Sequence, residues 1–302
     1  LYEKYFPNAE PFNIQRKNIA LLFNNNHFAS STVKPSMPSI IDIGGVHIDP
    51  AKPLPKDIQE FLDSAKDGAI LFSMGSIIQA VQWPEEKREA FVKVFAKLKQ
   101  KVLWKYENET LPNKPDNVMI SPWIPQRDIL AHPNIKLFIT HGGLLGTTEA
   151  LVEGVPVLGI PIFGDQKMNM NIAISKGYAS MITFDDVSEE TLTTELENIL
   201  SNRTVTTRAK EISRIYNDRP LSPQKSVVYW FEYVLRHKST SHLKTAGLNL
   251  SYIKFHSIDV YASFIVLTVV FSMMLKLLMR LFLRKFTKLI GLSTSEQKLK
   301  VN

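Results

Sequence analysis

An uncharged apolar run near the C-terminal end constrains this chain of 302 residues more than any other feature. Residues 260–275 (VYASFIVLTVVFSMML) carry no charge, and the apolar pattern continues to Leu283 with only Lys276 and Arg280 inside it. At about 1.5 Å per residue the run to Leu283 covers about 36 Å, more than a hydrocarbon core of about 30 Å. We therefore predict a transmembrane helix over residues 259–283. The alternative is a buried core helix, because the uncharged run is shorter than the usual length of about eighteen residues.

The charge on the two sides of this run predicts its orientation. Residues 276–302 hold seven Lys or Arg side chains and one Glu, a local net of 7 − 1 = +6. The whole chain carries 36 − 29 = +7, so residues 1–275 are nearly neutral at 7 − 6 = +1. Because positive charge stays on the cytosolic side of a membrane, we expect residues 284–302 to form a basic cytosolic tail and the preceding part to be lumenal. The charge thus fits contact with anionic membrane lipid, and nucleic acid is not an expected partner.

The first residues of the chain do not have the pattern of the signal peptide that a lumenal domain needs. LYEKYFPNAEPFN has neither an apolar segment nor a cleavage site, so we expect the sequence to be the C-terminal portion of a longer protein. Sequons at Asn108, Asn202 and Asn249 fit lumenal exposure, although such motifs also arise by chance. The chain has no cysteine, which excludes disulfides, Cys-ligated metal sites and a thiol nucleophile.

The part before the membrane alternates between strand-like and helix-like segments. Residues 18–28 and 39–48 read as short strands, and the proline-rich segment 49–57 reads as a linker. From Ala69 onward, strands are predicted at 69–76, 101–107, 117–123, 135–140, 155–162 and 178–184. Helices are predicted from Pro84 to about Leu98 and at 125–132, 143–154, 165–177 and 188–200. This alternation predicts an α/β fold, a Rossmann-like doubly wound parallel sheet. Ser188 is expected to cap the last helix, but without a full capping box, because Thr191 is neither an acid nor an amide.

In a doubly wound sheet the ligand lies at the carboxyl ends of the strands, so the residues that follow each strand are the candidates. His141, Gly142 and Gly143 lead from a strand into a helix, where backbone N–H groups and the helix dipole suit a phosphate. The alternative is a plain chain reversal. Glu149, two helical turns later, can accept hydrogen bonds from ribose hydroxyls, or it is simply a solvated carboxylate.

Other strand ends carry aromatic, amide and acidic side chains. Trp123 can stack on a nucleobase and Gln126 can bond its edge, although a core tryptophan is an equal alternative. Asp165 and Gln166 suit sugar hydroxyls, which need acceptors and donors together. The first strand ends in small residues that allow close approach of a ligand to the backbone. These are Ser73, Gly75 and Ser76.

The run WIPQRDILAHPNIKLFITHGGLLGTTEALVEGVPVLGIPIFGDQ resembles the signature of the UDP-dependent glycosyltransferases, in particular the membrane-anchored animal enzymes. The match continues in order through IGGVHI, FSMGS, VLWKYE and RPLSPQKSVVYWFEYVLRHK. The resemblance implies a GT-B fold, two Rossmann-like domains of which the C-terminal one binds the donor. It also implies location in the endoplasmic reticulum membrane.

The resemblance assigns roles to the candidate residues by position. Trp123 would stack on uracil, Gln126 would contact the base or ribose, and Glu149 would take the ribose hydroxyls. Five further residues would contact the rest of the donor. His141 and Gly143, with Ser76, would hold the diphosphate, and Asp165 with Gln166 the sugar hydroxyls.

The resemblance also implies what this chain does not supply. In the family, a His oriented by an Asp deprotonates the acceptor, and both belong to the N-terminal domain, of which residues 1–50 would be a remnant. No histidine here matches that base by motif position, so we name no catalytic residue, and we expect no metal and no cofactor because the UDP-sugar is a co-substrate. We expect the donor-binding domain at 51–240, including a return helix formed by residues 218–240 that crosses back to the N-terminal domain, and a membrane-proximal segment at 241–258.

The donor and acceptor are only partly constrained. Leu145 and Lys105 stand where many glucuronosyl-transferring relatives have Asn and Arg, which favours UDP-glucose as donor, with transfer to a small lipophilic acceptor by inversion. Homo- or hetero-oligomers are compatible with this interpretation. The alternative is a catalytically silent UDP-sugar-binding subunit. An NAD-dependent oxidoreductase is disfavoured because no G-x-G-x-x-G follows the first strand.

Overall fold

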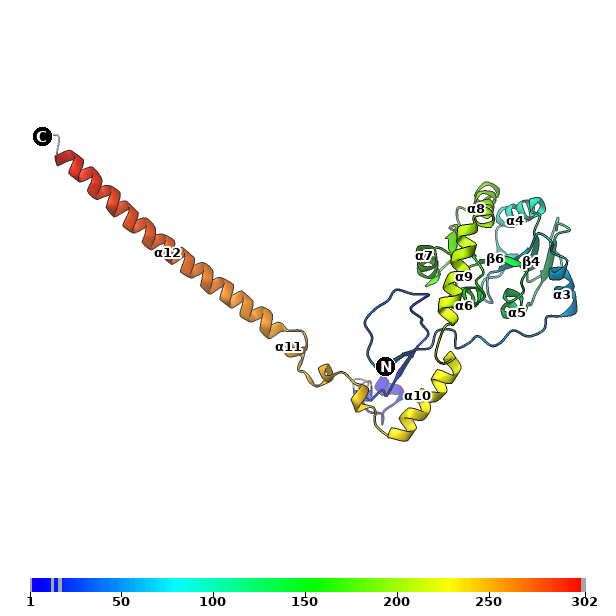
Figure 1. Cartoon of the computed structure of the whole chain (residues 1–302), viewed down its shortest axis with the longest axis horizontal. Helices are drawn as coiled ribbons and strands as arrows, with labels where there is room; N and C mark the ends of the chain where they lie inside the picture. The colour runs from blue at the N-terminus through cyan, green and yellow to red at the C-terminus, as the bar shows by residue number, and fades with distance from the viewer. Residues whose placement is uncertain (1, 12–13, 16–17, 300–302) are drawn as a thin grey trace. The chain divides into compact units, whose positions relative to one another are not determined.

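The computed structural model describes residues 2–11, 14–15 and 18–299. Leu1 and residues 12–13 and 16–17 of the expected N-terminal remnant lie outside the described residues, as do residues 300–302 of the expected tail. The chain divides into two units, one formed by Ile19–Thr240 and the other by Leu1–Asn18 with Ser241–Asn302 (Figure 1). Residues 19–50 therefore belong to the same compact unit as the central sheet.

A six-stranded sheet, entirely parallel, forms the centre of the first unit. Its strands are β3 (Ala69–Ser73), β4 (Lys101–Lys105), β5 (Val118–Ser121), β6 (Ile135–Thr140), β7 (Val157–Gly159) and β8 (Ala179–Met181). They lie in the order β5-β4-β3-β6-β7-β8. This is the doubly wound order of dinucleotide-binding folds, which reverses direction between β3 and β6. The predicted fold and all six predicted strands are confirmed.

Helices cover both faces of this sheet (Figure 1). They are α3 (Lys56–Asp63), α4 (Glu85–Lys97), α5 (Gln126–Leu130), α6 (Leu144–Glu153), α7 (Gln166–Ser175), α8 (Glu189–Ser201) and α9 (Arg203–Asn217), with a 3₁₀ turn at Ala80–Gln82. Helix α10 (Pro223–His237) follows them and has no buried residue. The side chains of α4 and α8 pack with Ile70 and Phe72 on one face. Those of α3, α5, α6 and α9 pack with Leu71 and Phe138 on the other. Alternate residues of β3 thus feed opposite cores, as the pleat requires.

The structure corrects three local expectations. Helices α3 and α9 were not predicted, and α3 begins at Lys56, inside the segment expected to be a linker. Pro84 is the N-cap of α4 and not its first helical residue. The capping box of α8 is complete, because the Thr191 hydroxyl accepts from the Ser188 N–H at 2.9 Å while Ser188 Oγ accepts from the Thr191 N–H at 3.1 Å. A hydroxyl therefore does here what a carboxylate or amide does in the standard box.

The short strands β1 (Leu22–Asn24) and β2 (Ile40–Asp42) pair in parallel outside the main sheet. The chain after β2 is tied to the end of α9 and the start of α10. Arg219 Nη1 donates to the Gly44 carbonyl at 2.7 Å, and Gln224 Nε2 donates to the carbonyls of Val46 and Ile48 at 3.1 and 2.8 Å. We call this set of contacts, from Arg219 and Gln224 to residues 44–48, the clasp.

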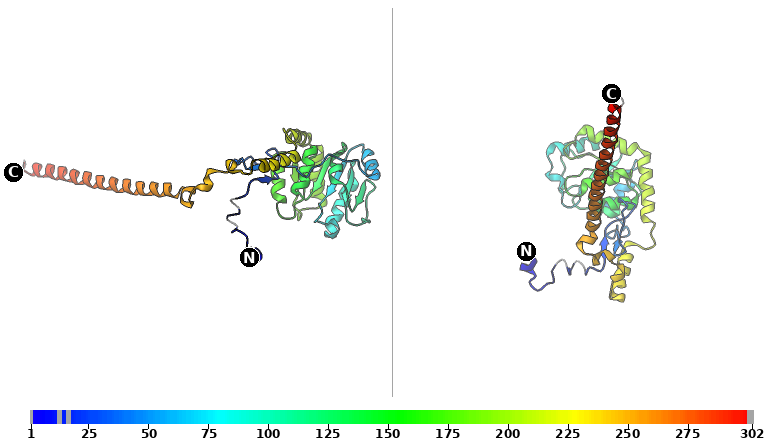
Figure 2. Two further views of the ribbon diagram at one scale, coloured as in Figure 1. Left: turned by 90° about the horizontal axis from the view of Figure 1, so that it is seen from below. Right: turned by 90° about the vertical axis from the view of Figure 1, so that its left-hand side faces the viewer.

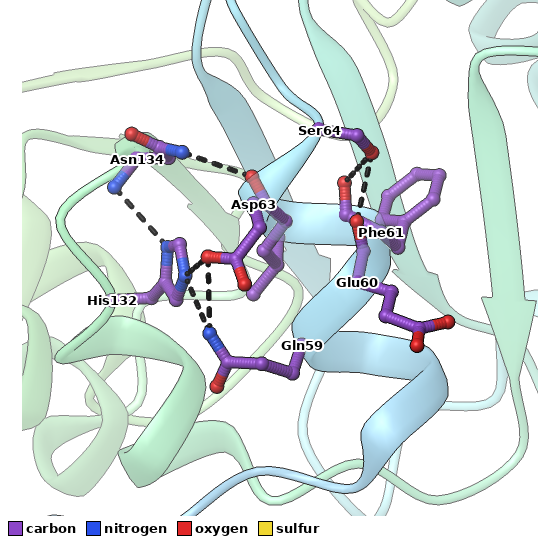
Figure 3. A network of polar contacts seen from close by, with 8 residues as sticks. Gln59, Glu60, Phe61, Asp63, Ser64, His132 and Asn134 are labelled. Carbon is purple, nitrogen blue, oxygen red and sulfur yellow. Dashed lines mark hydrogen bonds and ion pairs between the residues drawn. The ribbon is translucent and has the colours of Figure 1, made fainter.

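A polar network closes the amino ends of the central strands (Figure 3). His132 Nδ1 accepts from the Asn134 N–H at 3.2 Å, and His132 Nε2 lies 3.1 Å from Asp63 Oδ1, at the end of α3. Gln59 Nε2 donates to the same carboxylate oxygen at 3.1 Å, and Asn134 Nδ2 donates to the Leu62 carbonyl at 3.0 Å. This network fixes α3 to the loop before β6.

The second unit consists of short helical segments and one long helix. These are α1 (Tyr2–Tyr5), two 3₁₀ turns at Ser241–Leu243 and Ala246–Asn249, α11 (Tyr252–Phe255) and α12 (Ile258–Leu299). Figure 2 shows α12 as one unbroken helix. Its part Ile258–Lys288 is long and apolar enough to cross a membrane, with a mean hydropathy of 2.2 and none of its most apolar window buried. Within the described part of the chain, this helix thus has the length and composition of a membrane span and no buried face.

Candidate functional site

A cavity of about 600 Å³ opens at the carboxyl ends of β3 and β6, the point where the strand order reverses. Ten of the eleven residues predicted from the sequence line it. They are Ser73, Gly75, Ser76, Trp123, Gln126, His141, Gly143, Glu149, Asp165 and Gln166. These residues were selected because they follow strand ends, and the fold brings them together although they lie up to 93 positions apart, from 73 to 166.

His141 lies between two glycines from different loops. A Cβ on Gly75 would come within 2.7 Å of His141 Cε1, and one on Gly143 within 2.5 Å of His141 Nε2. Gly75 also has a φ of +79°, which side chains rarely adopt. Its N–H donates to the buried Ser73 hydroxyl at 3.3 Å. The loops after β3 and β6 therefore pack against the imidazole, and both glycines are needed for that contact.

The surroundings of His141 favour its neutral form. Burial lowers its pKa below the ordinary 6.5, although the carboxylate of Asp165 acts in the opposite direction. The Thr140 hydroxyl lies 3.3 Å from His141 Nδ1. When Thr140 donates to Nδ1, the neutral ring carries its proton on Nε2, which is then a donor without charge. Gly143 is the N-cap of α6 and supplies no side-chain cap, so the first N–H groups of the helix remain available.

Gly142 is the predicted residue that does not line the cavity. With a φ of +83° it turns the chain, and its carbonyl accepts from Asn169 Nδ2 at 3.1 Å. A Cβ there would lie 2.6 Å from Met170 Cγ. Gly142 thus seats the loop after β6 on α7, behind the cavity.

Trp123, Gln126 and Glu149 lie on one side of the cavity. The indole of Trp123 is 69% exposed, so the alternative of a core tryptophan is wrong. The Ser121 hydroxyl donates to the Trp123 carbonyl at 2.6 Å and holds this turn. Gln126 Nε2 donates to Glu149 Oε2 at 2.7 Å, so α5 and α6 are joined by a pair of residues that both line the cavity.

Asp165 and Gln166 begin α7 on the other side of the cavity. The side-chain carbonyl of Gln166, which is only 4% exposed, accepts from the N–H groups of Ile162 and Phe163 at 2.7 and 3.0 Å. Gln166 therefore shapes its own loop and leaves only its amide NH₂ for a ligand. Asp165 is exposed, and its Oδ2 accepts from Asn169 Nδ2 at 2.9 Å.

Lys105, which the resemblance connected with donor choice but which is not among the eleven predicted site residues, lines the cavity at the end of β4. Its Nζ lies 3.1 Å from Glu107 Oε1, and both side chains are only 17% exposed. The strand-end rule could have found it, because Lys105 is the last residue of a parallel strand. Exposed apolar side chains, among them Ile77, Leu145 and Phe163, also line the cavity. Within the described ranges, no group of three or more His, Asp or Glu side chains could hold a metal ion.

Comparison with known proteins gives one consistent result. The family model described as "UDP-glucoronosyl and UDP-glucosyl transferase" matches residues 7–294. "UDP-glycosyltransferase UGT5" of Dactylopius coccus is 43% identical over 267 residues, which cover 88% of this chain and 51% of that protein. "UDP-glucuronosyltransferase 2B17" of Mus musculus is 38% identical over 260 residues, covering 84% and 49%. The chain thus spans about half the length of these curated relatives.

A solved structure shows the fold. The UDP-glucose:anthocyanidin 3-O-glucosyltransferase, crystallised in complex with UDP, aligns with a TM-score of 0.52 and 18% identity, over 62% of this chain and 44% of that one. The parallel sheet and its covering helices are therefore those of a GT-B glycosyltransferase.

Proposed function

Because this chain belongs to the family of UDP-glucuronosyl and UDP-glucosyl transferases, we propose that the cavity at the ends of β3 and β6 binds the UDP-sugar donor of a glycosyl transfer. The observation that carries the proposal is the convergence of ten predicted residues at the reversal point of the sheet. A nucleotide in this place would have an exposed indole on one side and a helix N-terminus on the other.

Each part of the donor has a matching group. Trp123 stacks on uracil, and Gln126 with Glu149 bonds the base edge and the ribose hydroxyls. The diphosphate lies between Ser76, His141 and the start of α6, where donors without side-chain charge stabilise the negative charge that develops on the leaving UDP. Asp165 and the free amide of Gln166 take the sugar hydroxyls.

We infer that the hexose is glucose. A uronate would need a free cation in the cavity, but Lys105 is already paired with Glu107 at 3.1 Å. Only an arginine would offer a second, parallel hydrogen bond to a donor carboxylate. In calorimetric titrations we expect UDP-glucose to bind more tightly than UDP-glucuronate, and the reverse order would contradict this inference.

We further propose that α12 anchors the protein in the membrane of the endoplasmic reticulum, with the donor cavity lumenal and the basic end cytosolic. The apolar part Ile258–Lys288 and the excess of Lys and Arg after Leu275 support this orientation. The acceptor is then a small lipophilic molecule, which the membrane concentrates. We propose that its deprotonation and the inverting attack depend on groups outside this cavity, since among the described residues no histidine of the cavity is hydrogen-bonded to a carboxylate. The His132–Asp63 pair is at the opposite edge of the sheet.

Calorimetry of the purified chain in detergent tests the donor site. We expect UDP to bind and NAD not to bind. Equal binding of both, or of neither, would overturn the proposal. With UDP-glucose and a lipophilic alcohol, we expect no glycoside product from this chain alone, and detection of product would show that the chain supplies its own base.

A further inference from the structure

Asp165 occupies the N-cap position of α7 without capping the helix. A capping Asp is usually extended, and its carboxylate accepts from a backbone N–H of the first turn. Here the backbone is helical, with φ −81° and ψ −7°, and no such bond is present. Oδ2 accepts instead from Asn169 Nδ2 at 2.9 Å, one turn further along α7. The Asp165 carboxylate is thus oriented by a side chain and not by the helix backbone.

The side-chain NH₂ of Asn169 donates to two acceptors. One is Asp165 Oδ2, and the other is the Gly142 carbonyl at 3.1 Å. Because an amide NH₂ group has two hydrogens, each acceptor takes one of them. Asn169 therefore joins the start of α7 to the loop after β6, which also carries His141 and Gly143.

Packing holds α7 against the same loop. Met170, the next residue after Asn169, is fully buried, and a Cβ on Gly142 would come within 2.6 Å of Met170 Cγ. The packing brings the two segments together, and the amide of Asn169 adds the directional contact. Asn169 itself does not line the donor cavity, whereas Asp165 does. Any effect of Asn169 on the donor must therefore pass through the groups that it holds.

The carboxylate held in this way faces the diphosphate end of the cavity. Burial lowers the pKa of His141, and the Asp165 carboxylate opposes that shift, so the two side chains lie within electrostatic reach of each other. Within the described part of the chain, Asp165 Oδ1 has no hydrogen-bond partner. An exposed side chain samples several rotamers, and the bond from Asn169 to Oδ2 restricts them. The position of the remaining acceptor, Oδ1, is restricted as well.

We propose that Asn169 is a positioning residue, which orients the Asp165 carboxylate relative to the loop 141–143 so that Oδ1 accepts from a hydroxyl of the donor sugar. The inference rests on the proposed donor site and adds to it a residue outside the cavity. An acceptor that is already in place binds a hydroxyl more tightly than one that must first be ordered, because ordering costs conformational entropy. The contact between Asn169 and Asp165 therefore favours the sugar part of the donor over the nucleotide part.

Calorimetric titrations of the whole chain in detergent, with UDP and with UDP-glucose, test the proposal. Asn169→Leu keeps a side chain of similar size and removes both donors. We expect its affinity for UDP-glucose to fall about tenfold more than its affinity for UDP. Loss of the bond to Gly142 acts on both ligands, because both carry the diphosphate, and it cancels in this comparison. The matched control is Asn171→Leu, the same change at an exposed residue of α7 outside the cavity, which should alter neither affinity.

A double-mutant cycle with Asp165→Ala separates positioning from a general structural effect. In the Asp165→Ala background, Asn169→Leu should leave the ratio of the two affinities unchanged, because the carboxylate through which it acts is gone. Equal losses for UDP and UDP-glucose in the single variant, or a further change of the ratio in that background, would overturn the proposal. Asn169→Ala provides the same comparison if the leucine variant does not fold. Failure of the unmodified chain to bind UDP would instead overturn the proposed donor site, and this inference with it.

Discussion

A histidine lies at each of the two edges of the central sheet, and the two differ in how many of their ring nitrogens are bonded within the fold. At the amino ends of the strands, His132 is buried and both ring nitrogens are engaged, one by the Asn134 N–H and one by Asp63 (Figure 3). At the carboxyl ends, His141 has Thr140 beside Nδ1 and lines the cavity. A histidine whose nitrogens are all paired within the fold can only stabilise it, whereas one with a nitrogen left over can bind something else.

The largest expected effect is that of pH on stability, through a third histidine, His27, which is buried like His132. Its ring packs 4.5 Å from that of Tyr216, and burial, with a smaller effect of Arg219, lowers its pKa from 6.5 to about 4. Because the unfolded chain binds the proton more readily, stability is full above pH 6.5 and is lost as the pH falls from 6.5 toward 4. We expect the free energy of unfolding to fall by about 3 kcal/mol over this range.

Chemical denaturation at several pH values measures that loss, and the variant His27→Gln is the control, since it should flatten the profile. An unchanged slope in the variant would show that other groups cause the acid sensitivity.

The variant His141→Ala tests the open edge. It removes a donor to the diphosphate and should weaken UDP binding by about 1.5–3 kcal/mol, the usual contribution of a hydrogen bond to a charged group. The unfolding midpoint should fall only through the lost packing of the ring between Gly75 and Gly143, because no hydrogen bond of the fold beyond that with Thr140 depends on the ring nitrogens. Calorimetry measures the affinity, and UDP affinity equal to that of the unmodified chain would refute the phosphate role.

Trp123→Ala tests the base-binding side of the same edge. Stacking of a base on an aromatic ring is worth about 1–3 kcal/mol, and we expect a loss of UDP affinity in that range. Since the indole is 69% exposed, its removal should leave the stability within about 0.5 kcal/mol of the original. A large loss of stability with unchanged affinity would instead identify a structural tryptophan.

His132→Ala tests the closed edge and should give the opposite pattern to His141→Ala. The Asn134 N–H loses its acceptor and Asp63 its partner, which should lower the free energy of unfolding by about 1–2 kcal/mol. UDP affinity should remain unchanged. If both histidine variants lowered the affinity equally, the division between a binding edge and a stabilising edge would be wrong.

The contrast also explains which residues sequence patterns could identify. Strand ends are visible in the sequence because buried parallel strands read as apolar runs, and the residues after them were placed at one cavity by topology alone. Gly142 was misplaced because its role depends on Met170 and Asn169 of another helix. Helix α9 was not predicted, although Ala209, Ile212 and Tyr216 recur at the spacing of an amphipathic helix, so its period was present in the sequence.

The sequence by itself determined the alternation of strands and helices, the apolar length of α12 and the set of residues that follow the strands, because these depend on local composition and periodicity. Only the tertiary structure decided how those residues are used. It paired Gln126 with Glu149, committed the carbonyl of Gln166 to its own loop, and joined Lys105 to Glu107. Gln126 and Glu149 come from different helices, and even the local contacts of Gln166 and Lys105 depend on how a loop and a strand end pack in the fold. The polar atoms that remain available to a ligand are therefore defined only after folding.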